Sequence, residues 1–278
     1  MGEGLKKKKL NVCAIVLVVA GICSVIVGTQ AGMLIYSSAE TQKIVESDLP
    51  YDQKKAVLYS EALQEDNPAV IEYAFLRTTV RDPDGTTLQY VCDLWADTNR
   101  NWKVVSDPPG PEYISSSLES IKADLRGDCD DYSVLMAGLC GAVGADMRIV
   151  NVAGTGGSPG HAFPEYYLGD NRGDVIIQCR YISARYDCDR VYYSISPQDG
   201  ETGYWLNLDW SAGRNPDSGY YIYGNSSGYH ELVHPGQSYT TLGQSAEFFY
   251  PDGYYTKGVP GHGYYEEDLF GREALNAI

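Results

Sequence analysis

The stretch GDCDDYSVLMAGLCGAVGADMRIVNVAG, residues 127–154, contains the strongest structural pattern in the sequence. Apolar side chains recur at helical spacing, which predicts a helix with one buried face: Tyr132, Leu135, Met136, Leu139 and Val143. Asp128 is a natural N-cap, and Asp131 can reach back toward it as in a capping box. The segment MRIVNVA, residues 147–153, then predicts a strand. A helix that begins at Cys129 is therefore expected to lead into a strand.

Cys129 stands among acidic neighbours, with Asp128 before it and Asp130 and Asp131 after it. Negative neighbours disfavour a thiolate, so a reactive thiol here needs a compensating influence. The amino end of a helix supplies one, because it carries about half a positive charge. That partial charge also suits the acids, which can serve the helix without acting on the sulfur. A buried structural cysteine is the alternative interpretation.

Further elements flank this region. Strands are predicted at HAFPEYYL from His161 and at residues 174–182, 189–196 and 204–210. Upstream, Asn67 and Pro68 predict the start of a helix, and residues 88–105 predict a helix that ends in a short strand. The expected fold class is α+β, with the helix that carries Cys129 packed on an antiparallel sheet.

His161 and Asp209 lie on two of the predicted strands. If those strands are neighbours in one sheet, the two side chains can meet across it. A thiol needs a base to activate it, and the base needs an acceptor on its other nitrogen. Cys129, His161 and Asp209 are therefore the candidate catalytic residues, and a thiolate–imidazolium pair would outweigh the acids near the sulfur.

Three segments in this order resemble the transglutaminase-like superfamily, whose fold is papain-like: GDCDDYSVLMAGLCGAVGADMRIVNVAG, GHAFPEYYLG and YWLNLDWS. The resemblance spans roughly residues 88–212. It implies that Cys129 is the nucleophile, His161 the base and Asp209 the residue that orients the base. It further implies that the Cys129 backbone N–H is one oxyanion donor, with Trp102 a candidate for the second.

One departure from that family is the interval between His161 and Asp209, which is 48 residues and longer than the family's core needs. We expect an inserted hairpin that contains Cys179 and Cys188 to fill it.

The overall charge limits the kind of partner. The chain of 278 residues has 21 Lys and Arg against 37 Asp and Glu, a net charge of −16. Binding to nucleic acid requires Lys and Arg to neutralise phosphates, so this balance argues against a nucleic-acid partner. No cofactor is predicted.

The N-terminus predicts a membrane anchor. A basic block, Lys6 to Lys9, precedes a run without charge that extends to Glu40 and exceeds the roughly 20 residues needed to span a bilayer. Lysines before the run place the N-terminus inside and the rest of the chain outside the cell membrane. A cleaved signal peptide is the alternative, and it also exports the chain.

The predicted organisation has four parts. Residues 1–39 form a cytoplasmic basic stub and a single transmembrane helix, and residues 40–66 form a stalk or linker helix. Residues 67–212 form the transglutaminase-like domain, and residues 213–278 form a Tyr- and Gly-rich extension of hairpins packed on it.

Five cysteines lie in the exported region, so one is left over if the others pair within the chain. Besides Cys129 these are Cys92, Cys140, Cys179 and Cys188, which could form two disulfides in three connectivities or remain reduced.

A competing hypothesis comes from HELVH, residues 230–234, which fits the H-E-x-x-H signature of zinc peptidases. That mechanism needs His230 and His234 on successive turns of a helix beside Glu231, but Pro235 disfavours helical geometry at His234. We expect a loop or strand here. An inactive surface-binding module of the same fold is a third hypothesis.

The sequence therefore predicts an extracytoplasmic, membrane-anchored thiol enzyme that acts on amide bonds of a protein or peptide at the cell surface. Water as acceptor gives hydrolysis by a peptidase or amidase, and an amine gives cross-linking. The residues leave this choice open, because both reactions use the same catalytic groups.

Overall fold

The computed structural model divides the chain into two units, Met1–Leu49 and Pro50–Ile278. The structure describes residues 48–79, 87–106, 113–154, 160–198, 201–210, 223–224, 230–231, 234–239, 243–266 and 274–277. The predicted anchor, residues 1–39, lies outside these ranges. None of the helices within them is long and apolar enough to cross a membrane.

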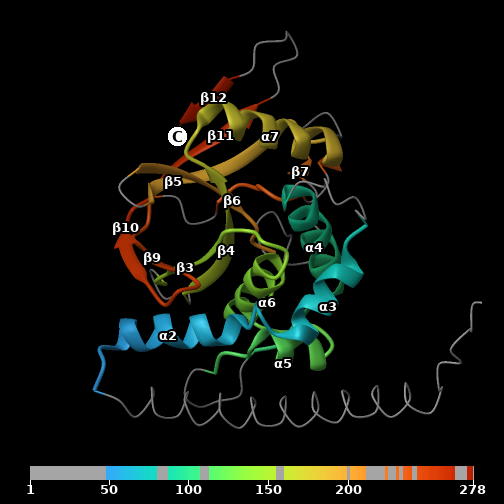
Figure 1. The fold of residues 1–278 in the computed structure, drawn as a ribbon. Coiled ribbons are helices and arrows are strands. Elements are labelled where there is room, and N and C mark those ends of the chain that lie inside the picture. The colour runs from blue at the N-terminus through green and yellow to red at the C-terminus, as the bar shows by residue number, and fades with distance from the viewer. Residues whose placement is uncertain are drawn as a thin grey trace, which may run out of the picture. The chain divides into compact units, whose positions relative to one another are not determined.

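Most helices in the described part of the second unit gather around one central helix. They are α2 (Tyr51–Leu63), α3 (Pro68–Arg77), α4 (Thr87–Asn101), α5 (Ser117–Lys122), α6 (Cys129–Gly141) and α7 (Arg172–Tyr186). Figure 1 shows α6 between the sheet and the helices α2 to α5, all four of which contact it. Because α6 is surrounded in this way, nearly all of its side chains from Asp130 to Cys140 are buried.

An eight-stranded sheet forms the other half of the unit. Its strands are β3 (Met147–Val152), β4 (His161–Gly169), β5 (Arg190–Gln198), β6 (Glu201–Asn207), β9 (Ala246–Phe249), β10 (Tyr255–Gly258), β11 (Gly261–Glu266) and β12 (Ala274–Ala277). Their order is β10-β9-β3-β4-β6-β5-β11-β12, and every neighbouring pair is antiparallel. Two short pairs lie outside this sheet: β1 (Lys103–Val104) with β2 (Arg126–Gly127), and β7 (Tyr223–Gly224) with β8 (His230–Glu231).

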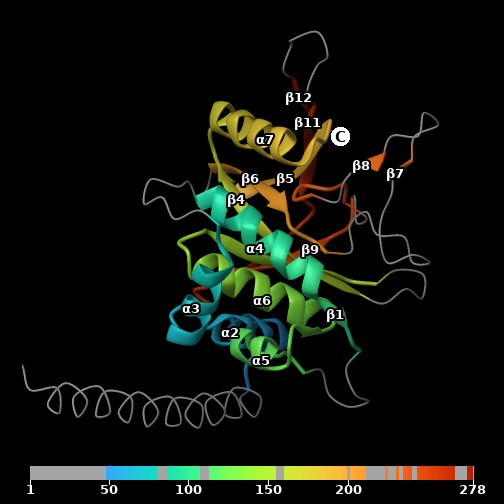
Figure 2. The same ribbon diagram turned by 90° about the vertical axis from the view of Figure 1, so that its right-hand side faces the viewer.

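The two faces of the sheet have different cores. The larger core contains the buried side chains of α6 together with Ile149, Leu206 and Tyr193 of the sheet. Helix α7 adds Val175, Cys179 and Ile182 to the same core. Figure 2 shows α6 and α7 along different parts of the sheet. A smaller core on the opposite face contains Val150, Val152, Phe163, Tyr239, Ala246 and Phe248.

A buried ion pair lies on that second face. Arg148 of β3 donates through Nε to Glu165 Oε2 of β4 at 2.7 Å, and both side chains are almost fully buried. The guanidinium lies between the rings of Trp205 and Phe248, 3.9 and 4.3 Å from their centroids. Buried charges are costly unless they are paired and hydrogen-bonded, and here both conditions are met.

The α+β class and the helix that carries Cys129 on an antiparallel sheet are present as predicted. The strand predicted at 174–182 and the hairpin expected around Cys179 and Cys188 are wrong, because this segment is the helix α7. Asn171 caps it by accepting hydrogen bonds from the N–H groups of Gly173 and Asp174. The insertion between His161 and Asp209 thus contains a helix followed by a strand.

Helix α2 and the C-terminal strands pack with the helices and strands between them. Helix α2 buries Ala56, Tyr59, Ala62 and Leu63 against the larger core. Strands β9 and β10 extend one side of the sheet, and β11 and β12 extend the other. Residues 51–63 and the strands after residue 245 therefore belong to the same folded unit as α6.

Candidate active site

Cys129 is the first residue of α6, and the turn before it is fixed by an acidic side chain. Asp131 is buried, and its carboxylate accepts hydrogen bonds from Ser115 N at 2.7 Å and from Asp128 N at 3.3 Å. A Cβ at Gly127 would lie 2.3 Å from Asp131 Oδ2, so only glycine leaves room for this carboxylate. Asp131 therefore serves the helix start, as the capping-box pattern predicted.

His161 and Asp209 are brought together by neighbouring strands. His161 is the first residue of β4, and Asp209 follows the end of β6, which pairs antiparallel with β4. His161 Nε2 lies 2.8 Å from Asp209 Oδ2. The predicted strand at 204–210 ends at Asn207, so Asp209 stands in the turn that follows it. The structure thus brings together the predicted base and its predicted acceptor.

The third predicted residue also contacts the imidazole. Cys129 forms a side-chain hydrogen bond with His161. Since Nε2 faces Asp209, Nδ1 is the nitrogen that remains for the sulfur. Burial lowers the pKa of His161, but the Asp209 carboxylate, and Cys129 after it, raise that pKa to about 10. The imidazolium is therefore the favoured form at neutral pH, and it is a suitable counter-ion for a thiolate.

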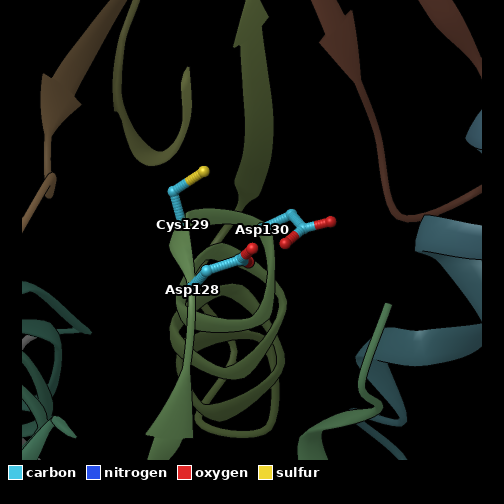
Figure 3. Close-up of side chains that lie close together, drawn as sticks. All are labelled: Asp128, Cys129 and Asp130. Atoms are coloured by element: carbon cyan, nitrogen blue, oxygen red, sulfur yellow. The ribbon is translucent and has the colours of Figure 1, made fainter. Parts of the chain in front are cut away.

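Asp128 and Asp130, the two acids beside Cys129, together carry less than two full negative charges. Figure 3 shows Cys129 at the tip of α6 with its sulfur directed away from the helix, while the carboxyl groups of Asp128 and Asp130 approach each other. Burial, and then the hydrogen bond and the charge of Asp128, raise the pKa of Asp130 to about 9. Asp130 is thus protonated at neutral pH, which lowers the negative charge around Cys129.

The same three side chains could hold a metal ion. One ligand atom each from Asp128, Cys129 and Asp130 lie within 4.8 Å of one another. A cation at this place would have to displace the proton of Asp130 and would occupy the sulfur. The set contains one soft sulfur donor and two hard oxygens, which favours a borderline ion such as Zn²⁺ over Mg²⁺.

The backbone that carries Asp209 is held by both α4 and α6. The Leu208 carbonyl oxygen accepts hydrogen bonds from Trp95 Nε1 of α4 and from Tyr132 Oη of α6, each at 3.2 Å. Leu208 N donates to Pro164 O of β4 at 3.0 Å. Tyr132 lies one turn after Cys129, so the helix that carries the thiol also holds the segment that carries the carboxylate. The helical spacing predicted Tyr132 only as a core residue.

Trp102, the candidate oxyanion donor, lies beside the first turn of α6. Its ring packs edge-on against Tyr132, with centroids 5.4 Å apart. Its Nε1 is buried and has no hydrogen-bond partner among the described residues. An unpaired buried N–H is costly unless it finds an acceptor.

The competing zinc signature is not helical in the described part of HELVH. His230 and Glu231 form the strand β8, and residues 232–233 lie outside the described ranges. His234 is buried, and its Nδ1 lies 2.8 Å from Pro235 O, as expected of an N–H donor to a carbonyl. An extended backbone does not place these side chains as the zinc-peptidase mechanism requires.

The other cysteines of the described chain are packing residues. Cys92, Cys140, Cys179 and Cys188 are buried free thiols, so neither of the two disulfides considered from the sequence is formed. Burial raises the pKa of Cys92 to about 12. Cys129 is partly exposed, whereas these four thiols are buried.

No known family profile matches the chain, and no curated protein sequence matches it. Among solved structures, one described as a candidate cysteine protease from Cytophaga hutchinsonii shares 14% identity over 83% of this chain, with a TM-score of 0.36. This chain covers 64% of that protein's length. Calcium-bound LapG of Legionella pneumophila shares 15% identity over 79% of this chain and 89% of its own, with a TM-score of 0.32. A likeness at this level gives no information about the site, whose assignment rests on the geometry above.

Proposed function

We propose that the protein is a thiol-dependent enzyme that acts on amide bonds through Cys129, His161 and Asp209. One observation carries the proposal: His161 lies between the other two residues, with Nε2 on the Asp209 carboxylate and a second hydrogen bond to Cys129. Each of these residues alone has an ordinary structural explanation. A thiol at a helix start, a base in reach of it and a buried acceptor behind the base together match the requirements of nucleophilic catalysis.

In the proposed reaction, the Cys129 thiolate attacks the amide carbonyl carbon and forms a C–S bond. The C–N bond then breaks, and the imidazolium of His161 gives its Nδ1 proton to the leaving nitrogen. Water next attacks the thioester, His161 takes a proton from it, and the C–S bond breaks to release the carboxylic acid. Asp209 keeps the ring oriented and stabilises the imidazolium in both stages.

The negative charge that develops on the carbonyl oxygen needs N–H donors. The first N–H groups of a helix have no partner within the helix, so the backbone N–H of Cys129 is a natural first donor. Trp102 Nε1 is the proposed second donor, supported by its unpaired state and its contact with Tyr132. Both groups would then hydrogen-bond the oxyanion rather than the ground-state carbonyl.

The proposed substrate is a protein or peptide outside the cytoplasm, with residues 1–39 as the membrane anchor. The basic block followed by a long uncharged run supports this location. Hydrolysis is the simpler outcome where water is abundant. Cross-linking uses the same three residues and differs only in having an amine as the acceptor.

The function is tested first by labelling with iodoacetamide. The full chain is treated at pH 6, and each cysteine is followed by peptide mass spectrometry. We expect fast modification of Cys129, slow modification of the buried Cys92 and Cys140, and no label at this position in Cys129→Ser. Labelling of Cys129 as slow as that of a free model thiol at pH 6 would remove the thiolate on which the proposal depends and would favour the binding module.

The second test separates the two acyl acceptors. Denatured casein is incubated with the full chain, with and without dansylcadaverine as a primary amine. New casein fragments indicate hydrolysis, and dansyl incorporation without fragments indicates cross-linking. Neither product should form with Cys129→Ser. Activity should be the same whether zinc is added or removed during purification. A metallopeptidase that uses His230 and His234 would lose activity without zinc.

A further inference from the structure

Asn207 is the last residue of β6, two positions before Asp209, and its side chain is buried. Its Oδ1 accepts a hydrogen bond from the Asp209 backbone N–H at 2.9 Å. This contact closes a short Asx-type turn, which fixes the direction in which the chain leaves the strand. The turn sets where the Asp209 side chain starts, and therefore where its carboxylate can reach.

The other half of the Asn207 amide contacts a segment far along the chain. Its Nδ2 donates to Gln237 O at 3.0 Å. We call residues 234–239 the strap. The strap is bound to two strands of the sheet, because Gly236 N donates to Asn207 O and Tyr192 N donates to Gly236 O, each at 2.7 Å. The strap therefore holds both the backbone and the side chain of Asn207.

The strap is packed closely against the sheet. Gly236 has a φ of +79°, and a Cβ there would lie 2.5 Å from Val191 Cγ1 and 2.8 Å from Leu206 Cδ1. Tyr239 donates to Glu165 Oε1 at 2.6 Å, which ties the strap to the buried ion pair of Arg148. The Tyr239 ring also packs on Phe163, whose ring packs on His161. The strap thus supports the base as well as the residue that orients it.

We infer that Asn207 is a positioning residue, which fixes the Asp209 carboxylate toward His161 and is itself fixed by the strap. The inference rests on the proposed function and adds to the site a residue that supports Asp209. The amide suits this place because one end must accept from an N–H while the other end must donate to a carbonyl. Neither serine nor aspartate offers both at this spacing.

The test compares Asn207→Ala, Asn207→Ser and Asn171→Ala with the wild-type full chain. Asn207→Ala removes both contacts. Asn207→Ser keeps a hydroxyl that can accept from the Asp209 N–H, but it is too short to reach Gln237 O. Asn171→Ala is the matched control, because it also removes an asparagine that accepts backbone N–H groups, but at the start of α7 and away from the site.

The readout is the rate of iodoacetamide labelling of Cys129 from pH 5 to pH 10, with the melting temperature of each variant. We expect Asn207→Ala to label about fivefold more slowly at pH 6, because losing a hydrogen bond of ordinary strength changes an equilibrium by about that factor. The acid limb of its profile should move to higher pH, since a poorly directed carboxylate stabilises the imidazolium less. Asn207→Ser should lie between it and the wild type.

Three outcomes would overturn the inference. Asn207→Ala could melt earlier yet keep the wild-type profile, which would make Asn207 purely structural. The labelling rate of Asn207→Ser could fall as far as that of Asn207→Ala, which would leave no role for the contact with the Asp209 N–H. Asn171→Ala could also shift the pH profile of labelling as much as Asn207→Ala does. If Asn207→Ala does not fold, the test is the comparison of the labelling rates of Asn207→Ser and Asn171→Ala. Failure of the proposed function would look different, because the wild-type Cys129 would then label slowly at pH 6.

Discussion

The replacement Asp209→Asn tests the site most directly, because it removes a charge and keeps the size of the side chain. Asp209 lies 2.8 Å from His161 Nε2, and its side chain is 4% exposed. The pKa of His161 rises from 6.5 to about 10, with Asp209 as the strongest cause that raises it. This change corresponds to a preference of roughly 5 kcal/mol for the imidazolium.

Part of that preference belongs to Cys129, and the His161 side chain is 22% exposed, so solvent screens the interaction. We therefore expect Asp209→Asn to remove about 2 to 3 kcal/mol, which is about a 30- to 150-fold loss of paired thiolate. Iodoacetamide labelling of Cys129 at pH 6 should slow by that factor. The rates of the two proteins should converge above about pH 10, where His161 is neutral in both and the effect of Asp209 on the imidazolium no longer matters.

Protein stability should change in the same direction. A histidine whose pKa in the folded state exceeds its value in the unfolded state stabilises the fold fully below pH 6.5 and loses that contribution as pH rises toward 10. Urea unfolding should show this loss in the wild type and much less of it in Asp209→Asn. Asp170→Asn, at an exposed position after β4, is the control. Equal labelling of Asp209→Asn and the wild type at pH 6 would refute the role given to Asp209.

Three further predictions concern groups around the site and in the core. Because the pKa of Asp130 is raised to about 9, its protonation stabilises the fold fully below pH 3.8, and this stabilisation is lost as pH rises through about 9. The melting temperature of Asp130→Asn should therefore rise relative to that of the wild type as pH increases. A difference in melting temperature that stays constant from pH 5 to pH 9 would contradict this. Arg148→Met should lower the free energy of unfolding in urea by about 3 to 5 kcal/mol, because it leaves Glu165 buried without its partner. The double variant Arg148→Met with Glu165→Gln should lose less. Equal losses in the two variants would argue against the ion pair. Zn²⁺ should slow the labelling of Cys129 more than Mg²⁺ does, with EDTA restoring it, and Asp130→Asn should weaken the effect; indifference to Zn²⁺ would show that Asp128, Cys129 and Asp130 do not act as a ligand set.

The part of the site that the sequence predicts is the part set by local rules. Asp128 and Asp131 mark the start of the helix that carries Cys129, and alternation along two strands places His161 and Asp209 where neighbours can meet. The pairing of β4 with β6 brings the last two residues together. Each of these signals extends over a few residues, so it can be recognised without knowledge of the tertiary contacts.

The errors arise where apolar runs are ambiguous. Residues 174–182 look like a strand because β-branched and apolar residues crowd together there, but Val175, Cys179 and Ile182 also fit the spacing of a buried helix face. Asn171 before the run was the available signal for a helix start. Periodicity alone does not separate a short buried strand from a buried helix.

The contacts that support the site could not be predicted from local patterns. Asn207 and Gln237 are 30 residues apart, and their hydrogen bond depends on where the strap crosses the sheet. The partner of Trp95 and Tyr132 is a backbone carbonyl, which has no signature in the sequence at all. Such contacts depend on the assembled fold.

The carbonyl of Leu208 has a consequence for how this protein should lose activity on heating. Because α4 and α6 both donate to that one oxygen, the segment leading to Asp209 is held by two helices of the core at once. Sites built on surface loops often inactivate well before the bulk of a protein melts. Here heat inactivation and cooperative unfolding should share one transition.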